Sequence, residues 1–285
     1  MANEFCVFIL SHGRPENVKT LTTLKKQGYT GDVYIIIDDE DESGTRYKEL
    51  YGDKVLIFCK DDAADITDAG DNFKQRNSVI YARNASFQLA RDVGYKYFIQ
   101  LDDDYDSFWY KFDEKKEYGN WKVESLDALF SVMVDYLSTI PFASIAMSQG
   151  GDHIGGGASK GIVNNLKIGS ARKAMNSFVC STDNPFRFIG RMNDDVNTYV
   201  CLQRQGTLFL TINSAELRQA TTQASAGGLT DMYLQYGTYV KSFYTVMYAP
   251  SCAKISTKNR LNRIHHSIKF RNIAPLILRE SVRKQ

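Results

Sequence analysis

Between Tyr95 and Trp109, a run of apolar and aromatic residues leads directly into a cluster of acids, in the stretch YKYFIQLDDDYDSFW. A second apolar run, DVYIIIDDED, ends in the same way, with Asp38 and Asp39 at the head of its acids. Continuous apolar strands are typical of parallel sheets, which are covered on both faces. In such sheets, ligands bind beyond the carboxyl ends of the strands. The two acidic strand ends therefore predict an α/β protein with a polar site along one edge of its sheet.

Strand and helix patterns alternate along the first part of the chain, as in βαβ units. We expect strands at 5–11, 32–41, 54–60 and 95–104, and helices at 14–28 and 73–94. Pro15 near the start and Gly28 past the end suit the first helix, and Gly94 closes the second. The second half is less regular and suggests antiparallel strands, including one at 239–248 with Val240, Phe243 and Val246 facing inward.

These patterns predict an α/β fold in which a mixed sheet is flanked by helices. No linker interrupts the chain, so we expect a single domain over 1–285. A nucleotide-binding half over 1–110 would pack against a second half over 111–285, which ends in a basic segment.

Charge and cysteine content narrow the class of protein. The 285 residues carry a formal net charge of +2, yet 254–285 holds nine basic residues against Glu280 alone. Such a segment indicates either a polyanionic partner or a solvated tail. The five cysteines are scattered without a CxxC pair and predict reduced thiols. The reduced thiols predict a cytoplasmic protein, and no obligate protein partner is evident. No apolar run approaches the length of a membrane span, so we expect no membrane contact.

The acids after the 95–104 strand suit a hard metal ion. Asp102 and Asp104 are two apart, so on an extended chain their side chains point the same way. One or two carboxylates together with substrate phosphates are a usual way to hold a divalent cation. The alternative is an acidic loop facing solvent. The second acidic strand end favours the metal.

The strand that ends in DxD, the helix with Ala82-Arg83-Asn84 before it and the opening ILSHGRPEN together resemble the nucleotide-sugar half of GT-A glycosyltransferases. That resemblance implies a UDP-sugar donor and a Mn²⁺ or Mg²⁺ ion that bridges its diphosphate. Arg76 and Arg83, seven residues apart and so on one helix face, could supply charge to the diphosphate or be solvated. The implied site residues are Ser11, Arg14, Asp38, Asp39, Arg76, Arg83, Asp102 and Asp103 for the nucleotide sugar and Asp104 for the metal.

Two further features match what such an enzyme needs. Asp194 and Asp195 precede an apolar helical pattern and resemble the acidic pair of inverting members, one of which would be the general base. Acids at a helix start also suit the helix dipole, so Asp194 could be only a cap. By the same resemblance, His266 or His265 would complete the metal site, although a histidine pair in a basic segment is often structural.

The stretch 223–255 resembles a small family of phage glycosyltransferases associated with TET- and J-binding-protein-type oxygenases. In those systems a hydroxymethylated cytosine or uracil in DNA is capped with a sugar. The resemblance implies modified DNA as the acceptor and the host cytoplasm as the location. Candidate acceptor contacts are Trp109, Asp152 and Lys241, each of which could instead be structural or solvated.

The resulting hypothesis is a metal-dependent transferase that moves glucose or arabinose from a UDP-sugar to 5-hydroxymethylcytosine or 5-hydroxymethyluracil in DNA. Alternatives are a glycan or protein acceptor, or an inert relative that binds nucleic acid. A nucleotidyltransferase is disfavoured because the first loop, SHGRPEN, contains a single glycine. Inversion at the anomeric carbon is preferred, because it needs only one general base, which Asp194 or Asp195 would supply.

Overall fold

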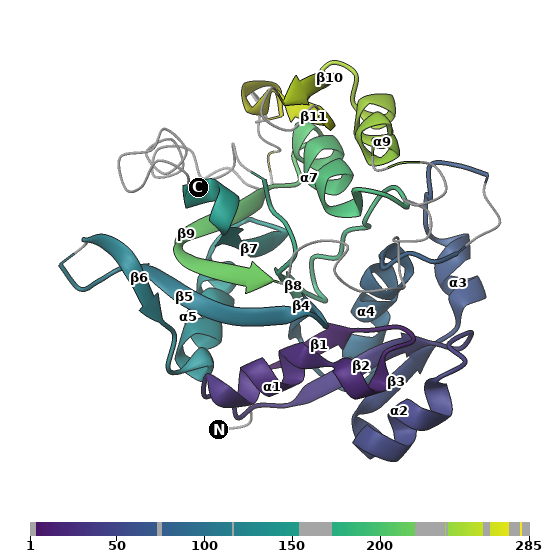
Figure 1. Cartoon of the computed structure of the whole chain (residues 1–285), viewed down its shortest axis with the longest axis vertical. Helices are drawn as coiled ribbons and strands as arrows, with labels where there is room; N and C mark the ends of the chain where they lie inside the picture. Colours follow the sequence, from purple (N-terminus) through teal and green to yellow (C-terminus); the bar gives the residue numbers. More distant parts are fainter. Residues whose placement is uncertain are drawn as a thin grey trace.

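The computed structural model describes residues 4–72, 76–115, 117–153, 173–219, 237, 239–258, 263–273 and 280. Its centre is a nine-stranded sheet in the order β3-β2-β1-β4-β8-β7-β9-β5-β6, and a separate two-stranded sheet pairs β10 with β11 (Figure 1). The strands are β1 (Phe5–Leu10), β2 (Val33–Asp38), β3 (Val55–Phe58), β4 (Tyr97–Asp102), β5 (Tyr105–Phe112), β6 (Tyr118–Lys122), β7 (Ser144–Gln149), β8 (Phe178–Ser181), β9 (Phe209–Gln219), β10 (Ala253–Lys258) and β11 (Arg263–Ile268).

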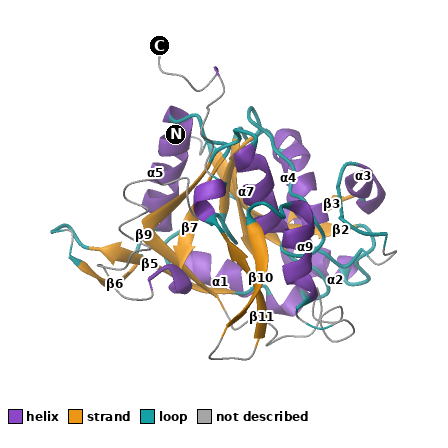
Figure 2. Ribbon diagram, turned by 90° about the horizontal axis from the view of Figure 1, so that it is seen from above, coloured by secondary structure: helices purple, strands orange, loops and turns teal. Residues whose placement is uncertain are grey.

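Helices lie on both faces of the large sheet (Figures 1 and 2). The α-helices are α1 (Lys19–Lys26), α2 (Gly44–Tyr51), α3 (Lys60–Asp65), α4 (Ile80–Asp92), α5 (Leu126–Thr139), α7 (Asp194–Arg204) and α9 (Val240–Tyr248). Short 3-10 turns occur at η1 (Pro15–Asn17), η2 (Gly52–Lys54), η3 (Gly150–His153) and η4 (Phe270–Asn272). The predicted α/β class, with a mixed sheet flanked by helices, is confirmed. None of the described helices has both the length and the apolar character needed to cross a lipid bilayer.

Strand β1 shows why the sheet is apolar throughout. Its six residues are all buried, and they alternate between two hydrophobic cores. Phe5, Val7 and Ile9 contribute to the core that α5 covers. Cys6 and Phe8 point to the other core, which α4 and α7 cover. A central strand between two helical layers needs apolar residues at every position.

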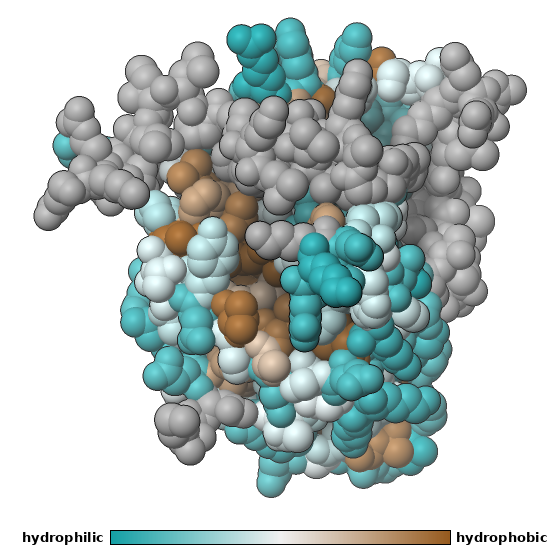
Figure 3. Space-filling model, turned by 90° about the vertical axis from the view of Figure 1, so that its left-hand side faces the viewer, coloured by the Kyte–Doolittle hydropathy of each residue, from teal (hydrophilic) through white to brown (hydrophobic). Residues whose placement is uncertain are grey.

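Strand pairing changes from parallel to mixed beyond β4, where the sequence pattern becomes less regular. Strands β1, β2, β3 and β4 pair in parallel, whereas β8 runs antiparallel to both β4 and β7. Strand β9 is parallel to β7, and β5 pairs antiparallel to β9 and β6. The expected antiparallel strands of the second half are therefore present. Figure 3 views the side of the β5–β6 hairpin, where hydrophobic residues gather in the middle of the face with hydrophilic residues beside and below them.

Two predictions about elements are wrong. Residues 240–248 form helix α9 and not a strand. Ser242 and Thr245, three apart and fully buried, face inward, while Phe243 is 49% exposed, so contact with α7 overrides the strand propensity of Tyr, Val and Phe. Arg76 is not on the helix that carries Arg83, because α4 begins at Ile80.

Candidate functional site

The predicted polar edge lies at the carboxyl ends of β1, β2 and β4. Parallel pairing aligns Leu10 with Ile36 on one side and with Asp102 on the other. Because the three strands end at one level, Ser11, Asp38 and Asp102 come to the same edge from distant parts of the sequence. This is the placement that the two acidic strand ends predicted.

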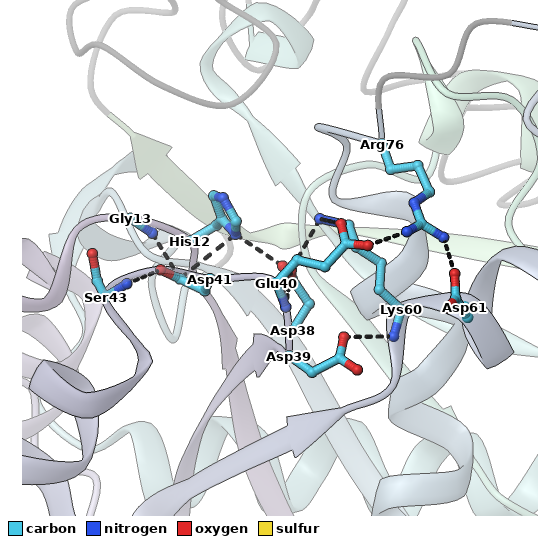
Figure 4. Close-up of polar contacts among 10 residues, drawn as sticks. All are labelled: His12, Gly13, Asp38, Asp39, Glu40, Asp41, Ser43, Lys60, Asp61 and Arg76. Carbon is cyan, nitrogen blue, oxygen red and sulfur yellow. Dashed lines mark hydrogen bonds and ion pairs between the residues drawn. The ribbon is translucent and has the colours of Figure 1, made fainter.

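The β2 end forms a network around Asp38 (Figure 4). Its carboxylate accepts a hydrogen bond from Lys60 Nζ at 2.9 Å and lies 2.8 Å from His12 Nδ1. Burial alone would raise the pKa of Asp38, but the hydrogen bonds from His12 and Lys60 outweigh it and lower the pKa to about 2. Asp39 is exposed and accepts the Lys60 backbone N–H at 2.9 Å. Of the two predicted nucleotide contacts, Asp39 thus has the accessible carboxylate, and its role stays a prediction.

His12 contacts two acids of this edge. Besides Asp38, its Nδ1 lies 3.5 Å from Asp41 Oδ2, which also accepts the Gly13 N–H at 2.8 Å. The hydrogen bond with Asp38 raises the pKa of His12 against the opposing effect of burial. Its side chain is 43% exposed, so the ring is oriented by acids while part of it faces solvent.

Arg76 belongs to the same edge but not to the arginine pair that the sequence predicted. Its guanidinium forms ion pairs with Glu40 and Asp61, as Figure 4 shows. Arg83 lies elsewhere and pairs with different acids. The two arginines therefore do not form one cationic face, because Arg76 precedes the helix.

The three consecutive acids after β4 have separate environments. Asp103 is buried, accepts the Ser11 hydroxyl at 2.5 Å and pairs with Arg14 Nη2 at 2.8 Å. Burial, against the effect of Arg14, raises the pKa of Asp103 to about 6. Ser11, Arg14 and Asp103, all predicted to contact the donor, are thus bonded to one another. Asp104 is half-buried, and burial followed by the charge of Asp102 raises its pKa.

Arg83 connects this turn to helix α7. Its Nη2 lies 3.0 Å from Asp102 Oδ1 and its Nε lies 2.8 Å from Asp194 Oδ2. The guanidinium is buried and stacks near the rings of Phe178 and Phe188, at 5.2 and 5.5 Å. Burial opposes the charged form of Arg83, but the two carboxylates outweigh burial and raise its pKa. A single arginine therefore joins the two acid clusters that the sequence identified separately.

Asp194 and Asp195 begin α7, as expected, after Asn193 in the left-handed conformation at φ 59°. Both carboxyl groups are buried, and burial raises both pKa values. Burial and the charge of Asp194 bring the pKa of Asp195 to about 7. Asp195 Oδ1 accepts the Val196 N–H at 2.7 Å. Asp195 is therefore a carboxylate that can exchange a proton near neutral pH.

The predicted histidine ligands lie beside this helix start. His266 Nδ1 is 3.1 Å from the Asn193 side-chain amide, and His265 Nδ1 is 2.6 Å from the His266 carbonyl oxygen. Within the described ranges, no group of three or more His, Cys, Asp or Glu side chains is arranged to hold a metal. The metal roles of Asp104, His265 and His266 stay predictions.

The predicted acceptor residues are distributed over three places. Trp109 lies on β5, donates its indole N–H to Ser107 at 2.8 Å and has Arg218 at 4.4 Å over its ring. Asp152 is buried in η3 and accepts the Gln149 N–H at 3.0 Å. Lys241 lies in α9. Most of the two motifs around these residues, at 154–161 and at 223–236, lies outside the described residues.

A second buried polar cluster was not identified from the sequence. Lys111 and Glu216, each 3% exposed, form an ion pair at 3.1 Å between β5 and β9. His153 Nε2 lies 2.7 Å from Ser148 Oγ and 3.6 Å from Glu216. Single polar residues spaced along separate strands form no sequence motif, so only the pairing of the strands reveals the cluster.

Comparison with known proteins places these features in context. Among solved structures, the chain is similar to glucosyl-3-phosphoglycerate synthase from Mycobacterium tuberculosis in complex with Mn²⁺ and UDP-glucose, with a TM-score of 0.48, 7% identity and coverage of 93% of this chain and 86% of that chain. A complex of the same enzyme with Mn²⁺, UDP-glucose and phosphoglyceric acid has a TM-score of 0.47, 9% identity and coverage of 96% and 88%. A search of curated protein sequences finds no match.

A family model gives the identification. The model described as TET-Associated Glycosyltransferase matches residues 5–228, which is well over half of the chain and includes the strand ends, Arg83 and the acidic start of α7. The matched range ends before α9, the β10–β11 hairpin and the basic C-terminal segment. The chain belongs to the TET-associated glycosyltransferase family and is a glycosyltransferase.

Proposed function

We propose that this enzyme transfers glucose or arabinose from a UDP-sugar to the hydroxymethyl group of 5-hydroxymethylcytosine or 5-hydroxymethyluracil in DNA, with Mn²⁺ or Mg²⁺ as cofactor. The observation that supports it most is the Arg83 bridge from Asp102 to Asp194. It places the acids at the sheet edge, where a nucleotide would bind, next to the acids at the start of α7. The family's association with TET enzymes supports a hydroxymethylpyrimidine acceptor.

The acids after β4 suit a divalent cation. Within the described ranges Asp104 forms no ion pair. Burial, followed by the neighbouring charge of Asp102, raises its pKa, so a cation there would stabilise the buried charge and relieve repulsion. Asp104, with Asp102 beside it, would hold the ion, and the donor diphosphate would complete the shell, as is usual for Mg²⁺. When bound, the ion would neutralise charge that develops on the leaving diphosphate.

Asp195 is the better candidate for the general base. Asp194 is held by Arg83, whereas Asp195 forms no ion pair with a described residue. With a pKa of about 7, Asp195 is partly ionised at neutral pH and retains enough basicity to accept the proton of the acceptor hydroxyl. Attack by that oxygen on the anomeric carbon, with departure of UDP, would invert the configuration.

The test is transfer to defined DNA. The protein would be incubated with Mn²⁺, a panel of UDP-sugars and oligonucleotides that contain hydroxymethylcytosine, hydroxymethyluracil or neither, and the nucleosides would be analysed by mass spectrometry. We expect a hexose or pentose mass increment on one modified base, abolished by EDTA and strongly reduced in Asp104→Asn. Asp106→Asn is the matched control, because Asp106 is an exposed acid two residues away that pairs with Lys19.

Three results would contradict all or part of the proposal. UDP-sugar binding without an increment on any DNA would leave a glycosyltransferase with another acceptor, such as a glycan or a protein. If the protein neither binds a sugar nucleotide nor transfers a sugar, it is an inert relative. Full activity in the presence of EDTA would contradict only the proposed metal requirement.

A further inference from the structure

Helix α9 and the β10–β11 hairpin form a unit above the start of α7 (Figures 1 and 2). The helix packs against both hairpin strands and against α7. Asn193, the residue before the two acids of the site, connects all three parts. Its side-chain amide lies 3.1 Å from the Lys241 carbonyl oxygen, 3.0 Å from Thr245 Oγ1 and 3.1 Å from His266 Nδ1. The position of this unit is thus linked directly to the residue that caps α7.

The outer face of α9 is apolar. Tyr239, Phe243 and Met247 are 47%, 49% and 55% exposed, and their spacing of four places them in one row on the helix surface. The rings of Tyr239 and Phe243 meet edge to face, with centroids 6.1 Å apart. The inner face of the helix holds the fully buried Ser242 and Thr245. Contiguous exposed apolar side chains of this kind are typical of interaction surfaces.

The positive charge of this unit indicates a negatively charged partner. The sequence from Gly237 to Arg279 contains eight basic residues and no Asp or Glu. Among them Lys254, Lys269 and Arg271 have exposed side chains, on the hairpin that α9 packs against and on the segment that follows it. A second copy docked through the same surface would bring two cationic faces together and be repelled. Aromatic side chains within a basic surface are instead typical of sites for unstacked nucleic-acid bases and their phosphates.

We propose that the unit of α9 and β10–β11 is the surface that holds the DNA around the target nucleotide. Tyr239, Phe243 and Met247 would pack against unstacked bases, and Lys254, Lys269 and Arg271 would contact phosphates. A base must leave the stack before an enzyme can act on it, and an exposed apolar row on a helix that packs against α7 would offer the flanking bases a contact. Because Asn193 joins the unit to the start of α7, DNA held there would present its target to Asp195. This inference rests on the proposed DNA acceptor and adds where DNA binds.

The experiment measures DNA binding by fluorescence anisotropy, with a labelled single-stranded oligonucleotide that carries one hydroxymethylcytosine, at 50–200 mM NaCl. Phe243→Ala should weaken binding about 5- to 150-fold, the range for losing one base–aromatic stack. Tyr136→Ala is the matched control, since Tyr136 is an aromatic of similar exposure on α5 and should bind like wild type. Phe243 is half exposed, so its removal should leave the fold intact, and thermal unfolding would verify this.

The basic residues are tested through the salt dependence. The variant with Lys254→Ala, Lys269→Ala and Arg271→Ala should reduce the slope of log K against log salt by about 2, because each phosphate contact on a single strand contributes about 0.7. Lys25→Ala with Lys26→Ala, two exposed lysines on α1, should leave the slope unchanged. UDP binding should be the same in all variants.

The results separate this inference from the proposed function. The wild type could glycosylate DNA while the Phe243 and basic variants bind DNA and react as the wild type does. That result would overturn the proposed DNA-binding surface but not the proposed function. Wild type that neither binds nor modifies DNA would overturn both proposals. If Phe243→Ala instead converts an oligomer to a monomer without changing DNA affinity, the apolar row is a self-association surface and the inference is wrong.

Discussion

Arg83 and Asp194 form an ion pair at 2.8 Å, and the arginine is buried within the protein. The same guanidinium reaches Asp102 at 3.0 Å. It therefore joins the end of β4 to the start of α7. A buried arginine between two acids is costly to desolvate, and its two ion pairs offset that cost. Here the geometry holds the two halves of the candidate site together.

Removing the Arg83 charge should destabilise the protein strongly. Arg83→Met would leave Asp102 and Asp194 without their shared cation, so we expect a loss of about 3–5 kcal/mol in the free energy of unfolding. Urea unfolding followed by circular dichroism would measure it. Arg91→Met on the same helix is the control, because Arg91 is exposed and bonds only the Thr182 carbonyl among the described residues. An equal effect of both variants would contradict the bridging role.

Asp195→Asn should abolish most of the activity while preserving donor binding. Removing a general base lowers the rate by about 10²- to 10⁴-fold. In the wild type, kcat should rise as the pH increases through about 7, because the ionised form of Asp195 is the reactive one. Steady-state kinetics between pH 5 and 9, with UDP affinity from calorimetry, would separate chemistry from binding. A flat pH profile would exclude Asp195 as the base.

The same substitution should stabilise the protein at high pH. The pKa of Asp195 is raised to about 7 in the folded protein, above its value in an unfolded chain. Its favourable contribution is therefore complete below the unfolded pKa and is lost as pH rises through about 7. Asparagine cannot ionise, so Asp195→Asn should exceed wild type in the free energy of unfolding more at pH 8.5 than at pH 5. Identical differences at both pH values would contradict the raised pKa.

Asp38 should behave in the opposite sense. Its pKa is lowered to about 2 by His12 and Lys60, so its contribution is present above the unfolded pKa and is lost as pH falls toward 2. Asp38→Asn should lower the free energy of unfolding by about 2 kcal/mol at pH 6. The deficit should shrink as pH falls below 4. Asp53→Asn, at an exposed acid in η2, is a control that should change little.

Gly28 is required by both its conformation and its surroundings. It has φ +74°, and a Cβ added there would lie 2.4 Å from the Glu124 carbonyl oxygen. Gly94 has φ +83° but nothing within 4 Å of such a Cβ. Both alanine variants should lose at least about 1 kcal/mol from the backbone, and Gly28→Ala should lose clearly more. Thermal unfolding of the pair isolates the steric contact; equal losses would show that the loop of Glu124 moves aside.

Several parts of the fold followed from local chemistry. A central strand between two helical layers must be apolar along its length, and 5–10 and 33–37 show that pattern. Gly28 and Gly94 mark helix ends because glycine readily adopts positive φ. The helical periodicity after Asp195 correctly predicted α7.

Other features were not readable from local sequence. The stretch 239–248 is rich in residues that favour strands, yet it is helical from Val240 because α7 buries Ser242 and Thr245 on one side. Helices α2, α3 and α5 were not anticipated. Arg76 and Arg83 have a helical spacing, but α4 starts between them, so they pair with different acids.

The sequence by itself determined the α/β class, the acidic edge and the acids at the start of α7, because hydrophobic periodicity and strand ends are local properties. Tertiary structure alone decided how those acids are used. Asp103 is bonded to Ser11 and Arg14, Asp104 is left without an ion pair among the described residues, and Arg83 reaches Asp194. These roles depend on distances between residues that are far apart in the chain, and burial between them sets the pKa values.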